Sequence, residues 1–419
     1  MQKFGLNRCV RQWIMLGALC AMLLGGCALG TPTPEPVTIT FAHINFDQEW
    51  YAALLQEFNK EYPHITVELK SVEPRDWYSQ RGREGADVFA HMDWAMRDLV
   101  ERGQVMELDA FVEQQESIDL QDFYPGVREH FALNGKTWAI PAGLDIMVLF
   151  YHQDLFDEYG VPYPQDGWTL QDFEQMLAGL RDPQTNVFGY APIDLTLETL
   201  LVVYQHGGKL VDSLQTPTQV LFDEPSTIEA LDWYFDLMHE YDLIPTPDEI
   251  RSFGGSRDSH VYYGFATGHV GSWIGELSQA GGRYWPSEWN MNWGMAALPR
   301  GANQATIAQV EGYFVSAETE HPEACWKWIE FLSRQIPERL APTRKSIVES
   351  ELYEAQVGLG VATMIRTSLA GELLMEPMEA PPALEADLAL FGQAMQSIAD
   401  GESTVEEAIF WIEQESQFK

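Results

Sequence analysis

Short apolar and polar alternations and longer helical periodicities follow one another along the N-terminal third of the chain. Residues 37–41 alternate with a period of two, which is typical of a strand with one covered face. Apolar side chains then recur at helical spacing until Tyr62 and Pro63, and the alternation returns at 65–69. A strand, a helix and a strand in this order predict two parallel strands joined by a right-handed crossover.

The same patterns continue along the chain and predict an α/β protein. Residues 146–151 are apolar without interruption, which favours a strand buried on both faces of a parallel sheet. Asn134 and Gly135 predict a turn. The other expected strands lie at 87–90, 137–141, 293–298 and 313–316, and the other expected helices at 170–180, 226–241 and 323–332.

The first residues of the chain have the features of an export signal. A basic segment precedes an uncharged apolar run at 13–24. This run is shorter than the about 20 residues of a membrane-spanning helix and fits a secretory signal of roughly 7 to 15. Residues 24–27, Leu-Gly-Gly-Cys, resemble the bacterial lipobox, whose cysteine is lipidated and becomes the mature N-terminus. We therefore expect a signal peptide at 1–26 and lipidation of Cys27, with an ordinary signal and an incidental cysteine as the alternative.

Threonine and proline alternate at 31–36, directly after this signal. Proline restricts the backbone and lacks an amide donor, so such a segment favours an extended polyproline conformation. We expect residues 27–36 to form a tether between the lipid and the folded protein.

The charge balance of the chain is strongly acidic. It has 25 Lys and Arg residues against 63 Asp and Glu residues, a formal net charge of −38 at pH 7. Most of such a surface repels the phosphates of nucleic acids and the head groups of anionic lipids, so no nucleic-acid partner is expected. We interpret the acidity as a means of staying soluble at the cell exterior.

Motifs for catalysis or cofactor binding are absent from the sequence. There is no phosphate-binding, dinucleotide-binding, zinc-protease or serine-hydrolase motif. His91 and Asp93 offer two ligand types without a third nearby, so no metal and no cofactor are expected. Of four cysteines, only Cys325 lies beyond the predicted signal and lipidation site, which excludes an intramolecular disulfide and predicts a buried thiol. We therefore expect a protein that is not an enzyme.

Several phrases of the sequence occur in the order found in one protein family. They are 58–67 (FNKEYPHITV), 86–89 (ADVF), 134–141 (NGKTWAIP), 149–156 (LFYHQDLF), 298–301 (LPRG), 321–326 (HPEACW) and 342–346 (PTRKS). With them, the chain resembles the extracellular solute-binding proteins of bacterial ABC importers, in particular the maltose-binding-like family 1. The resemblance extends from Ile39 to about Ala408, and the family's glycine-rich and tryptophan-containing segment is present in a shortened form at 265–273.

This resemblance implies a two-lobed periplasmic-binding-protein-like fold of type II, with the ligand cleft between the lobes. On this basis the first lobe comprises 37–145 and 294–332, and the second lobe begins with 146–293. The C-terminal helical part, 333–419, belongs mainly to the second lobe. Solute contacts made only in the closed form would shift the population toward closure, and a membrane permease would recognise that form.

The resemblance also implies a function. We expect a lipid-anchored monomer on the extracytoplasmic face of the cell membrane that captures a sugar or oligosaccharide and delivers it to an ABC permease. Three alternatives remain open: a receptor for another small polar or cationic solute such as a polyamine, a sensor that does not transport, and a glycoside hydrolase. A hydrolase needs two suitably spaced carboxylates, but a chain with 63 acidic residues contains such a pair by chance, so carboxylates alone do not identify this class.

Candidate solute ligands lie in the loops that follow strands, because a sugar needs aromatic rings and hydrogen-bonding side chains in one cleft. Asn45 and Asp47 follow the first strand, although Asp47 could instead cap the next helix. Asp93 and Trp94 follow the third strand. Asp93 stands about where the family has a solute-binding acid, and Trp94 either stacks on a sugar or packs under its own helix.

Asp145 is the preferred candidate. It directly precedes the apolar run 146–151, where a charge needs a partner or water. It also coincides with the position at which maltose-binding-like proteins carry a hinge carboxylate that faces the sugar. The alternative role is a hydrogen bond between the lobes at the hinge.

Five further candidates come from the later part of the chain. Trp273 offers a stacking surface and Glu276 a hydroxyl acceptor. Glu311 and Tyr313 lie where the chain is expected to return to the first lobe, and Tyr313 either faces the cleft or packs in the core. Arg344 either binds the solute or pairs with one of the many acids.

Overall fold

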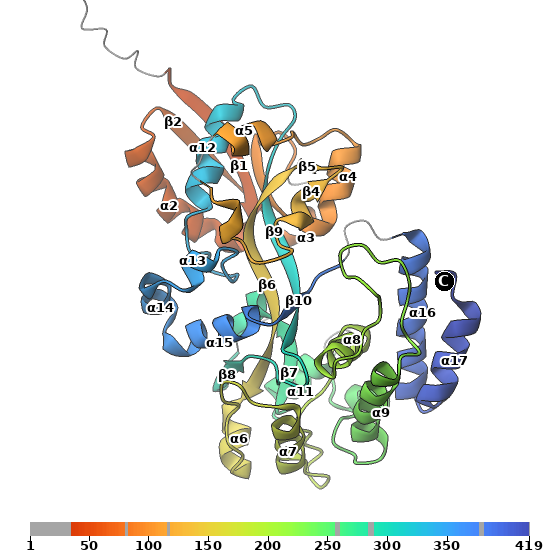
Figure 1. Cartoon of the computed structure of the whole chain (residues 1–419). Coiled ribbons are helices and arrows are strands. Elements are labelled where there is room, and N and C mark those ends of the chain that lie inside the picture. The colour runs from red at the N-terminus through yellow and green to blue at the C-terminus, as the bar shows by residue number, and fades with distance from the viewer. Residues whose placement is uncertain are drawn as a thin grey trace, which may run out of the picture.

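The two lobes of the protein are visible in a computed structural model, one above the other in Figure 1. The structure describes residues 35–79, 83–114, 118–255, 260–283, 289–376 and 381–418. The predicted signal peptide, Cys27 and most of the predicted tether lie outside the described residues. None of the helices in these ranges has the length and apolar character that a bilayer crossing requires.

One mixed sheet runs through both lobes, in the order β2, β1, β3, β9, β6 and β7, with β10 beside β9 and β8 beside β6. The parallel pairing of β1 with β2 and β3 confirms the predicted crossover. The strands are β1 (Val37–Ile44), β2 (Ile65–Val72), β3 (Val88–Met92), β6 (Ala139–His152), β7 (Ser272–Glu276), β8 (Trp293–Ala296), β9 (Ala305–Val315) and β10 (Glu372–Leu374).

The apolar run 146–151 forms the lower part of β6, but the prediction of a parallel sheet there is wrong. This part of β6 pairs in antiparallel fashion with β7, β8 and β9. Both faces of the strand are nevertheless covered, because Ile146 and Val148 lie in one core cluster and Leu149 lies in another. An uninterrupted apolar run therefore reports burial of both faces and not the direction of the neighbouring strands.

The upper lobe packs helices against β1, β2 and β3. Phe58 of α2 contacts Trp328 of α12 edge to face, with 4.9 Å between the ring centroids. Cys325 is fully buried on α12, as predicted. The helices and short 3-10 turns are η1 (Asn45–Asp47), α2 (Gln48–Glu61), α3 (Pro74–Tyr78), η2 (Asp93–Ala95), α4 (Met96–Glu101), α5 (Asp109–Gln114), η3 (Leu120–Asp122), η4 (Glu129–Phe131) and α12 (Pro322–Leu332).

The predicted turn at Asn134 and Gly135 is confirmed between β4 (Ala132–Leu133) and β5 (Lys136–Thr137). Both residues have positive φ values, 55° and 73°. A tight two-residue hairpin requires this conformation at both positions, and asparagine and glycine adopt it at the lowest cost.

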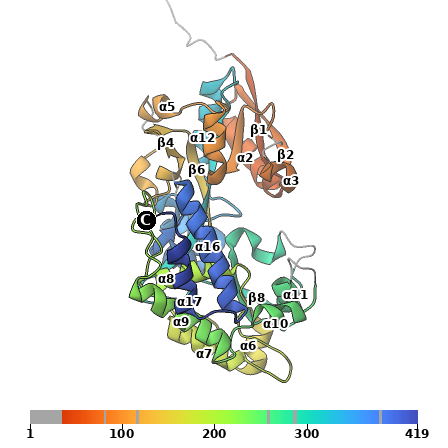
Figure 2. The same cartoon turned by 90° about the vertical axis from the view of Figure 1, so that its right-hand side faces the viewer.

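The lower lobe consists mainly of helices around the lower ends of β6, β7 and β8. The predicted helix 170–180 is confirmed as α7, which begins with a capping box of Thr169 and Asp172. Figure 2 shows α16 and α17 side by side against α8 and α9. The helices are α6 (Gln153–Tyr159), α7 (Leu170–Leu180), α8 (Leu195–Gln205), α9 (Pro225–His239), α10 (Pro247–Ser252), α11 (His260–Ala266), η5 (Leu277–Gly282), α16 (Pro382–Ala399) and α17 (Val405–Glu415).

Three more helices, α13 (Lys345–Val348), α14 (Glu351–Val357) and α15 (Leu359–Leu369), lie beside the junction between the lobes (Figure 1). The exact division of the sequence between the lobes stays a prediction. In the structure, residues 293–296 form β8 beside residues 149–152 of β6, whereas β9 follows β6 from residue 139 to residue 146.

Candidate functional site

The parallel strands β1, β2 and β3 end at one edge of the upper lobe. They are followed by η1, α3 and η2, so these three turns lie at the junction between the lobes (Figure 1). The predicted ligands Asn45 and Asp47 belong to η1, and Asp93 and Trp94 belong to η2.

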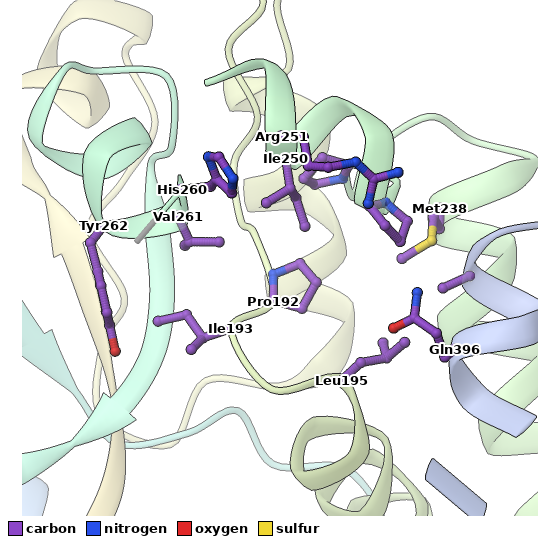
Figure 3. Close-up of a pocket in the computed structure, with 13 residues that line it drawn as sticks. Pro192, Ile193, Leu195, Met238, Ile250, Arg251, His260, Val261, Tyr262 and Gln396 are labelled. Atoms are coloured by element: carbon purple, nitrogen blue, oxygen red, sulfur yellow. The ribbon is translucent and has the colours of Figure 1, made fainter. Parts of the chain in front are cut away.

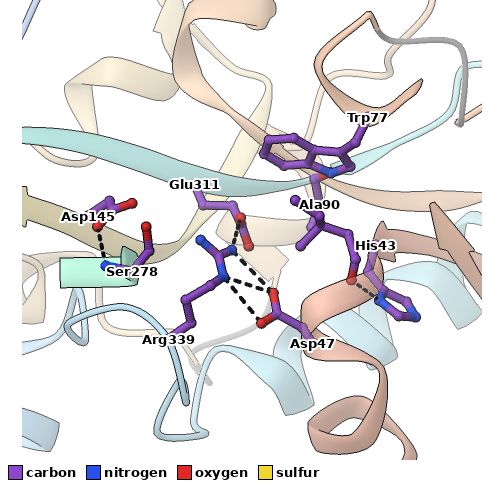
Figure 4. A network of polar contacts seen from close by, with 9 residues as sticks. His43, Asp47, Trp77, Ala90, Asp145, Ser278, Glu311 and Arg339 are labelled. Carbon is purple, nitrogen blue, oxygen red and sulfur yellow. Dashed lines mark hydrogen bonds and ion pairs between the residues drawn. The ribbon is translucent and has the colours of Figure 1, made fainter. Parts of the chain in front are cut away.

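A buried group of charged side chains lies at this junction (Figure 4), and we name Asp47, Asp145, Glu311 and Arg339 the junction cluster. Arg339 donates from Nη2 to Oε2 of Glu311 at 2.7 Å and to Oδ2 of Asp47 at 3.2 Å. Its Nε donates to Oδ1 of Asp47 at 3.2 Å. The side chain of Asp47 makes no capping hydrogen bond to α2, so the capping alternative is wrong. Its carboxylate is turned to the guanidinium instead.

Asp145 lies in the same cluster and carries a perturbed pKa. Its Oδ1 accepts a hydrogen bond from the backbone N–H of Ser278 in η5 at 2.9 Å. Burial, followed by the negative charge of Glu276, raises the pKa of Asp145 to about 7, against the lowering effect of Arg339. The cluster thus holds three carboxylates against one guanidinium, and Asp145 is the one whose charge is least compensated.

Tyr78 of the upper lobe lies within electrostatic reach of the carboxylates of Asp145, Glu311 and Glu276. It ends the short helix α3, which is fixed because the indole N–H of buried Trp77 donates to the carbonyl of Ala90 at 3.1 Å. The side chain of Tyr78 is 51% exposed. Loss of water around its hydroxyl raises the pKa of Tyr78, and the charges of Glu276, Asp145 and Glu311 raise it further, so this phenol lies within electrostatic reach of both β6 and β7.

Two amide side chains at the junction have buried oxygens without a hydrogen-bond partner among the described residues. Asn45 donates from Nδ2 to Glu73 at 3.1 Å, and its Oδ1 has no partner. Gln279 donates from Nε2 to Glu276 at 2.8 Å, and its Oε1 has none. A buried polar atom left unpaired costs about 1 to 3 kcal/mol, so both oxygens are acceptors that a ligand or water would satisfy.

Glu276 and Gln279 also line a cavity of about 190 Å³ in the lower lobe, which we name the Glu276 cavity. Its walls are mainly apolar and include Met147, Ile193 and Tyr262. A mainly apolar cavity with a few polar groups at one end is the usual form of a small-molecule site.

The structure places the other predicted residues in two kinds of environment. Asp93 is buried outside the junction cluster's hydrogen bonds, with its Oδ2 at 3.1 Å from Nδ1 of His130 and at 3.4 Å from the backbone nitrogen of Val310. Trp94 is 42% exposed and contacts the buried His91 edge to face, so part of its surface is open to solvent, and the choice between its two roles stays a prediction.

Trp273, Tyr313 and Arg344 are engaged by other protein groups. Trp273 is fully buried against Phe150, with 4.9 Å between the ring centroids, so its ring has no solvent-exposed face in this conformation, although Trp273 is one of the residues that line the Glu276 cavity. Tyr313 is buried beside Phe41 in the upper core, as its alternative role required. Arg344 donates to Asp122 at 2.7 Å, which also matches its alternative role. The part that each of the ten predicted residues plays in solute binding stays a prediction.

The sequence analysis missed Arg339, Tyr78 and Gln279. Arg339 lies between α12 and α13, in a segment without periodicity, and its carboxylate partners are 28 and 292 residues away. Tyr78 belongs to a helix of 5 residues, too short to show a helical pattern. Gln279 lies three residues after the predicted Glu276, and this proximity was the one available signal.

The family of the chain follows from its sequence. A sequence model of the bacterial extracellular solute-binding proteins matches residues 44–335. This chain belongs to that family. The matched segment runs from the end of β1 to just beyond α12 and contains strands and helices of both lobes.

Related proteins extend this assignment. The arabinooligosaccharide-binding protein of Bacillus subtilis (strain 168) is 21% identical over 266 residues, 60% of this chain and 58% of that protein. This chain thus spans less than two thirds of that relative's length. An uncharacterised lipoprotein of Streptomyces antibioticus is 21% identical over 379 residues, 84% of this chain and 81% of that protein. The solved structure of a cyclic α-maltosyl-1,6-maltose-binding protein from Arthrobacter globiformis is 17% identical, with a TM-score of 0.70 over 90% of this chain and 97% of that one, which confirms the two-lobed fold.

The raised pKa of Asp145 predicts a pH-dependent stability. A folded-state pKa of about 7 exceeds the ordinary value of 3.8, so the native protein holds this proton more tightly than the unfolded chain does. Stability should therefore fall as the pH rises from about 4 to about 7, with a slope of at most about 1.4 kcal/mol per pH unit. Urea unfolding between pH 5 and pH 8 should show that Asp145→Asn lacks this part of the slope. The exposed Glu240→Gln serves as the control, and parallel curves for wild type and Asp145→Asn would contradict the assignment.

Loss of Arg339 should be far more costly than loss of an exposed arginine. Arg339→Leu leaves Asp47 and Glu311 buried without a counter-charge, and breaking such a pair costs about 3 to 5 kcal/mol. Arg334→Ala removes an exposed pair with Glu61 and should cost about 1 kcal/mol or less. Chemical denaturation measures both, and the triple variant with Asp47→Asn and Glu311→Gln should recover part of the loss. Equal costs for the two arginines would refute this account of the cluster.

Proposed function

We propose that this solute-binding protein captures a sugar or oligosaccharide in the cleft between its lobes and delivers it to the permease of an ABC importer. The observation that carries the proposal is that the half-exposed ring of Tyr78 lies at the junction between the lobes, within electrostatic reach of the carboxylates of Asp145 and Glu276. A sugar ring has an apolar face that packs on an aromatic ring, and hydroxyls at its edge that donate to carboxylates. Tyr78 and the two acids offer both kinds of contact in one place.

The ligands of related proteins support this class of solute. One relative binds arabinooligosaccharides, and one structural neighbour binds a cyclic maltosyl-maltose. Both ligands are oligosaccharides, so oligomers of pentose and of glucose are the first solutes to test. The family consists of binding proteins and not of enzymes. We propose that this protein likewise carries out no chemistry on its solute.

A cationic solute is the second candidate. The junction cluster has three carboxylates and one guanidinium, and Glu276 adds a further carboxylate close enough to raise the pKa of Asp145. An excess of negative charge in a cleft attracts an amine. A polyamine such as spermidine therefore belongs in the same binding screen.

Solute binding would act on the relative position of the lobes. Arg339 joins η1 of the upper lobe to β9, and the hydrogen bond from Ser278 to Asp145 joins η5 of the lower lobe to β6. A solute that contacts Tyr78 and Glu276 at once gains both contacts only when the lobes are close together. It therefore shifts the population toward the closed form, which the permease would recognise.

The proposed location of the protein is the outer face of the cell membrane, where it would meet the permease. The family is extracellular, and we propose more narrowly that Cys27 carries a lipid after removal of residues 1–26. Residues 27–36 would then tether a monomer to the extracytoplasmic face of the cell membrane. The relative in Streptomyces antibioticus that is a lipoprotein supports this anchor.

A thermal-shift screen tests the proposed ligand class. A ligand that binds only the native state stabilises it by about 2.7 kcal/mol at 100 times its Kd. We expect arabino- or malto-oligosaccharides to raise the unfolding temperature. Tyr78→Ala should then weaken binding about tenfold, equal to about 1.4 kcal/mol, by isothermal titration calorimetry. Tyr241→Ala is a matched control, because Tyr241 is 54% exposed and lies beyond the end of α9. A shift with spermidine alone would contradict the sugar proposal, and equal losses in the two variants would contradict the role of Tyr78.

The lipid anchor can be tested at the cysteine itself. Cys27→Ser should move the protein from the membrane fraction to the soluble or secreted fraction of the producing bacterium and abolish labelling by a radioactive fatty acid. Cys20→Ser, within the predicted signal, should leave both results unchanged. Continued membrane attachment of the Cys27→Ser protein would show that the anchor is not at this residue.

A further inference from the structure

A second, larger cavity of about 460 Å³ lies in the lower lobe beside the Glu276 cavity (Figure 3). It is lined by the segment before α8, the connection from α9 to α10, α10 itself, the start of α11 and the end of α16, and it is open on one side. Its floor is aliphatic and includes Leu195, Met238 and Ala399. Its polar rim consists of Arg251, His260 and Gln396.

The two cavities share two lining residues, Ile193 and Tyr262. Figure 3 shows these two side chains at one side of the larger cavity, with Gln396 at the opposite side. The two cavities are therefore direct neighbours, on either side of these two side chains.

The shared wall is held in place by a buried carboxyl group. Glu198 of α8 accepts from the backbone N–H of Ile193 at 2.7 Å and from that of Asp194 at 3.3 Å. It also contacts the hydroxyls of Tyr190 and Tyr234. The segment that separates the cavities is thus fixed to the core of the lobe, and the shape of the site exists before a ligand arrives. Such preorganisation lowers the entropic cost of binding.

The volumes indicate how much of a ligand each space holds. Cavities that hold small ligands usually measure about 300 to 1,000 Å³. At about 190 Å³, the Glu276 cavity lies below this range, while the neighbouring cavity lies within it. A ligand confined to the smaller space would leave the larger one unused, although Ile193 and Tyr262 line both.

The rim of the larger cavity suits a ligand with hydroxyl groups. Gln396 donates from Nε2 to Asp400 at 2.9 Å, and Figure 3 shows its carbonyl oxygen on the side of the cavity. The ring of His260 is held through Nδ1 at 2.5 Å from the carbonyl oxygen of Gly254, which directs its other nitrogen away from that bond. Arg251 adds hydrogen-bond donors. The rim thus supplies donors and acceptors, and the aliphatic floor can cover the apolar face of a ring.

We propose that the larger cavity is a distal subsite for a linear oligosaccharide, so that the solute has at least three sugar units. The first units lie between Tyr78 and Glu276, and the next unit passes Ile193 and Tyr262 to reach the rim of Arg251 and Gln396. This inference rests on the proposed function, because it names the length class of the same solute.

The test is a titration series of one sugar from monomer to hexamer, chosen by the thermal-shift screen and measured by isothermal titration calorimetry. We expect wild type to bind the trimer and longer oligomers at least about tenfold more tightly than the dimer, which corresponds to about 1.4 kcal/mol. Gln396→Trp places a large ring at the exposed edge of the cavity. It should weaken binding of the trimer about tenfold or more and leave the affinity for the dimer unchanged.

Gln393→Trp is the matched control, because Gln393 is exposed on the same helix and does not line the cavity. It should bind every oligomer as wild type does, and both variants should keep the unfolding temperature of wild type. Equal affinity of wild type for dimer and trimer would overturn the distal subsite while the proposed function stands. An equal effect of Gln396→Trp on dimer and trimer, or no effect on either, would do the same. Failure of all sugars to bind would overturn the proposed function together with the subsite.

Discussion

One guanidinium compensates the charged groups at the junction of the two lobes. Arg339 contacts Asp47 and Glu311, which belong to η1 and β9, while Asp145 on β6 is held by a backbone N–H of η5. Taking carboxylates out of water costs several kcal/mol per ion, and a single counter-charge repays that cost only for the groups that it touches. The arrangement of the strands shared by both lobes therefore depends on a contact made by a residue from a segment with no regular structure.

The sequence predicted most of the fold, because the fold depends on local periodicity. The alternations at 37–41 and 65–69 became β1 and β2, and the helix at 170–180 was predicted to the residue. The direction of the strands beside 146–151 was not predictable in this way. Period and burial are properties of one segment, whereas direction depends on how distant segments of the chain are ordered in the sheet.

The candidate site was predicted less completely, and strand geometry explains part of the reason. Trp273 and Glu276 were expected in one cleft, and both line the Glu276 cavity, although residues three apart on a strand point to opposite faces. Trp273 pairs with Phe150 and is fully buried, so its ring has no solvent-exposed face, whereas Glu276 pairs with Met147 and is half-buried. Asp145 could be singled out from the sequence because a charged residue directly before a buried apolar strand needs a partner or water. Arg339 was not, because its partners are remote in sequence and its own segment has no pattern.

The two halves of the proposed site differ in how they can respond to a solute. In the lower lobe, buried Glu198 fixes the segment between the two cavities, so this wall offers a constant shape. At the junction, the charge on Asp145 is poorly compensated, and hydroxyl or ammonium donors from a solute would stabilise its ionised form. A solute would thus be selected by length and shape in the lower lobe and would change the charge balance between β6 and β9. Since these strands are shared by both lobes, the proposed binding would be coupled to lobe position through the junction cluster.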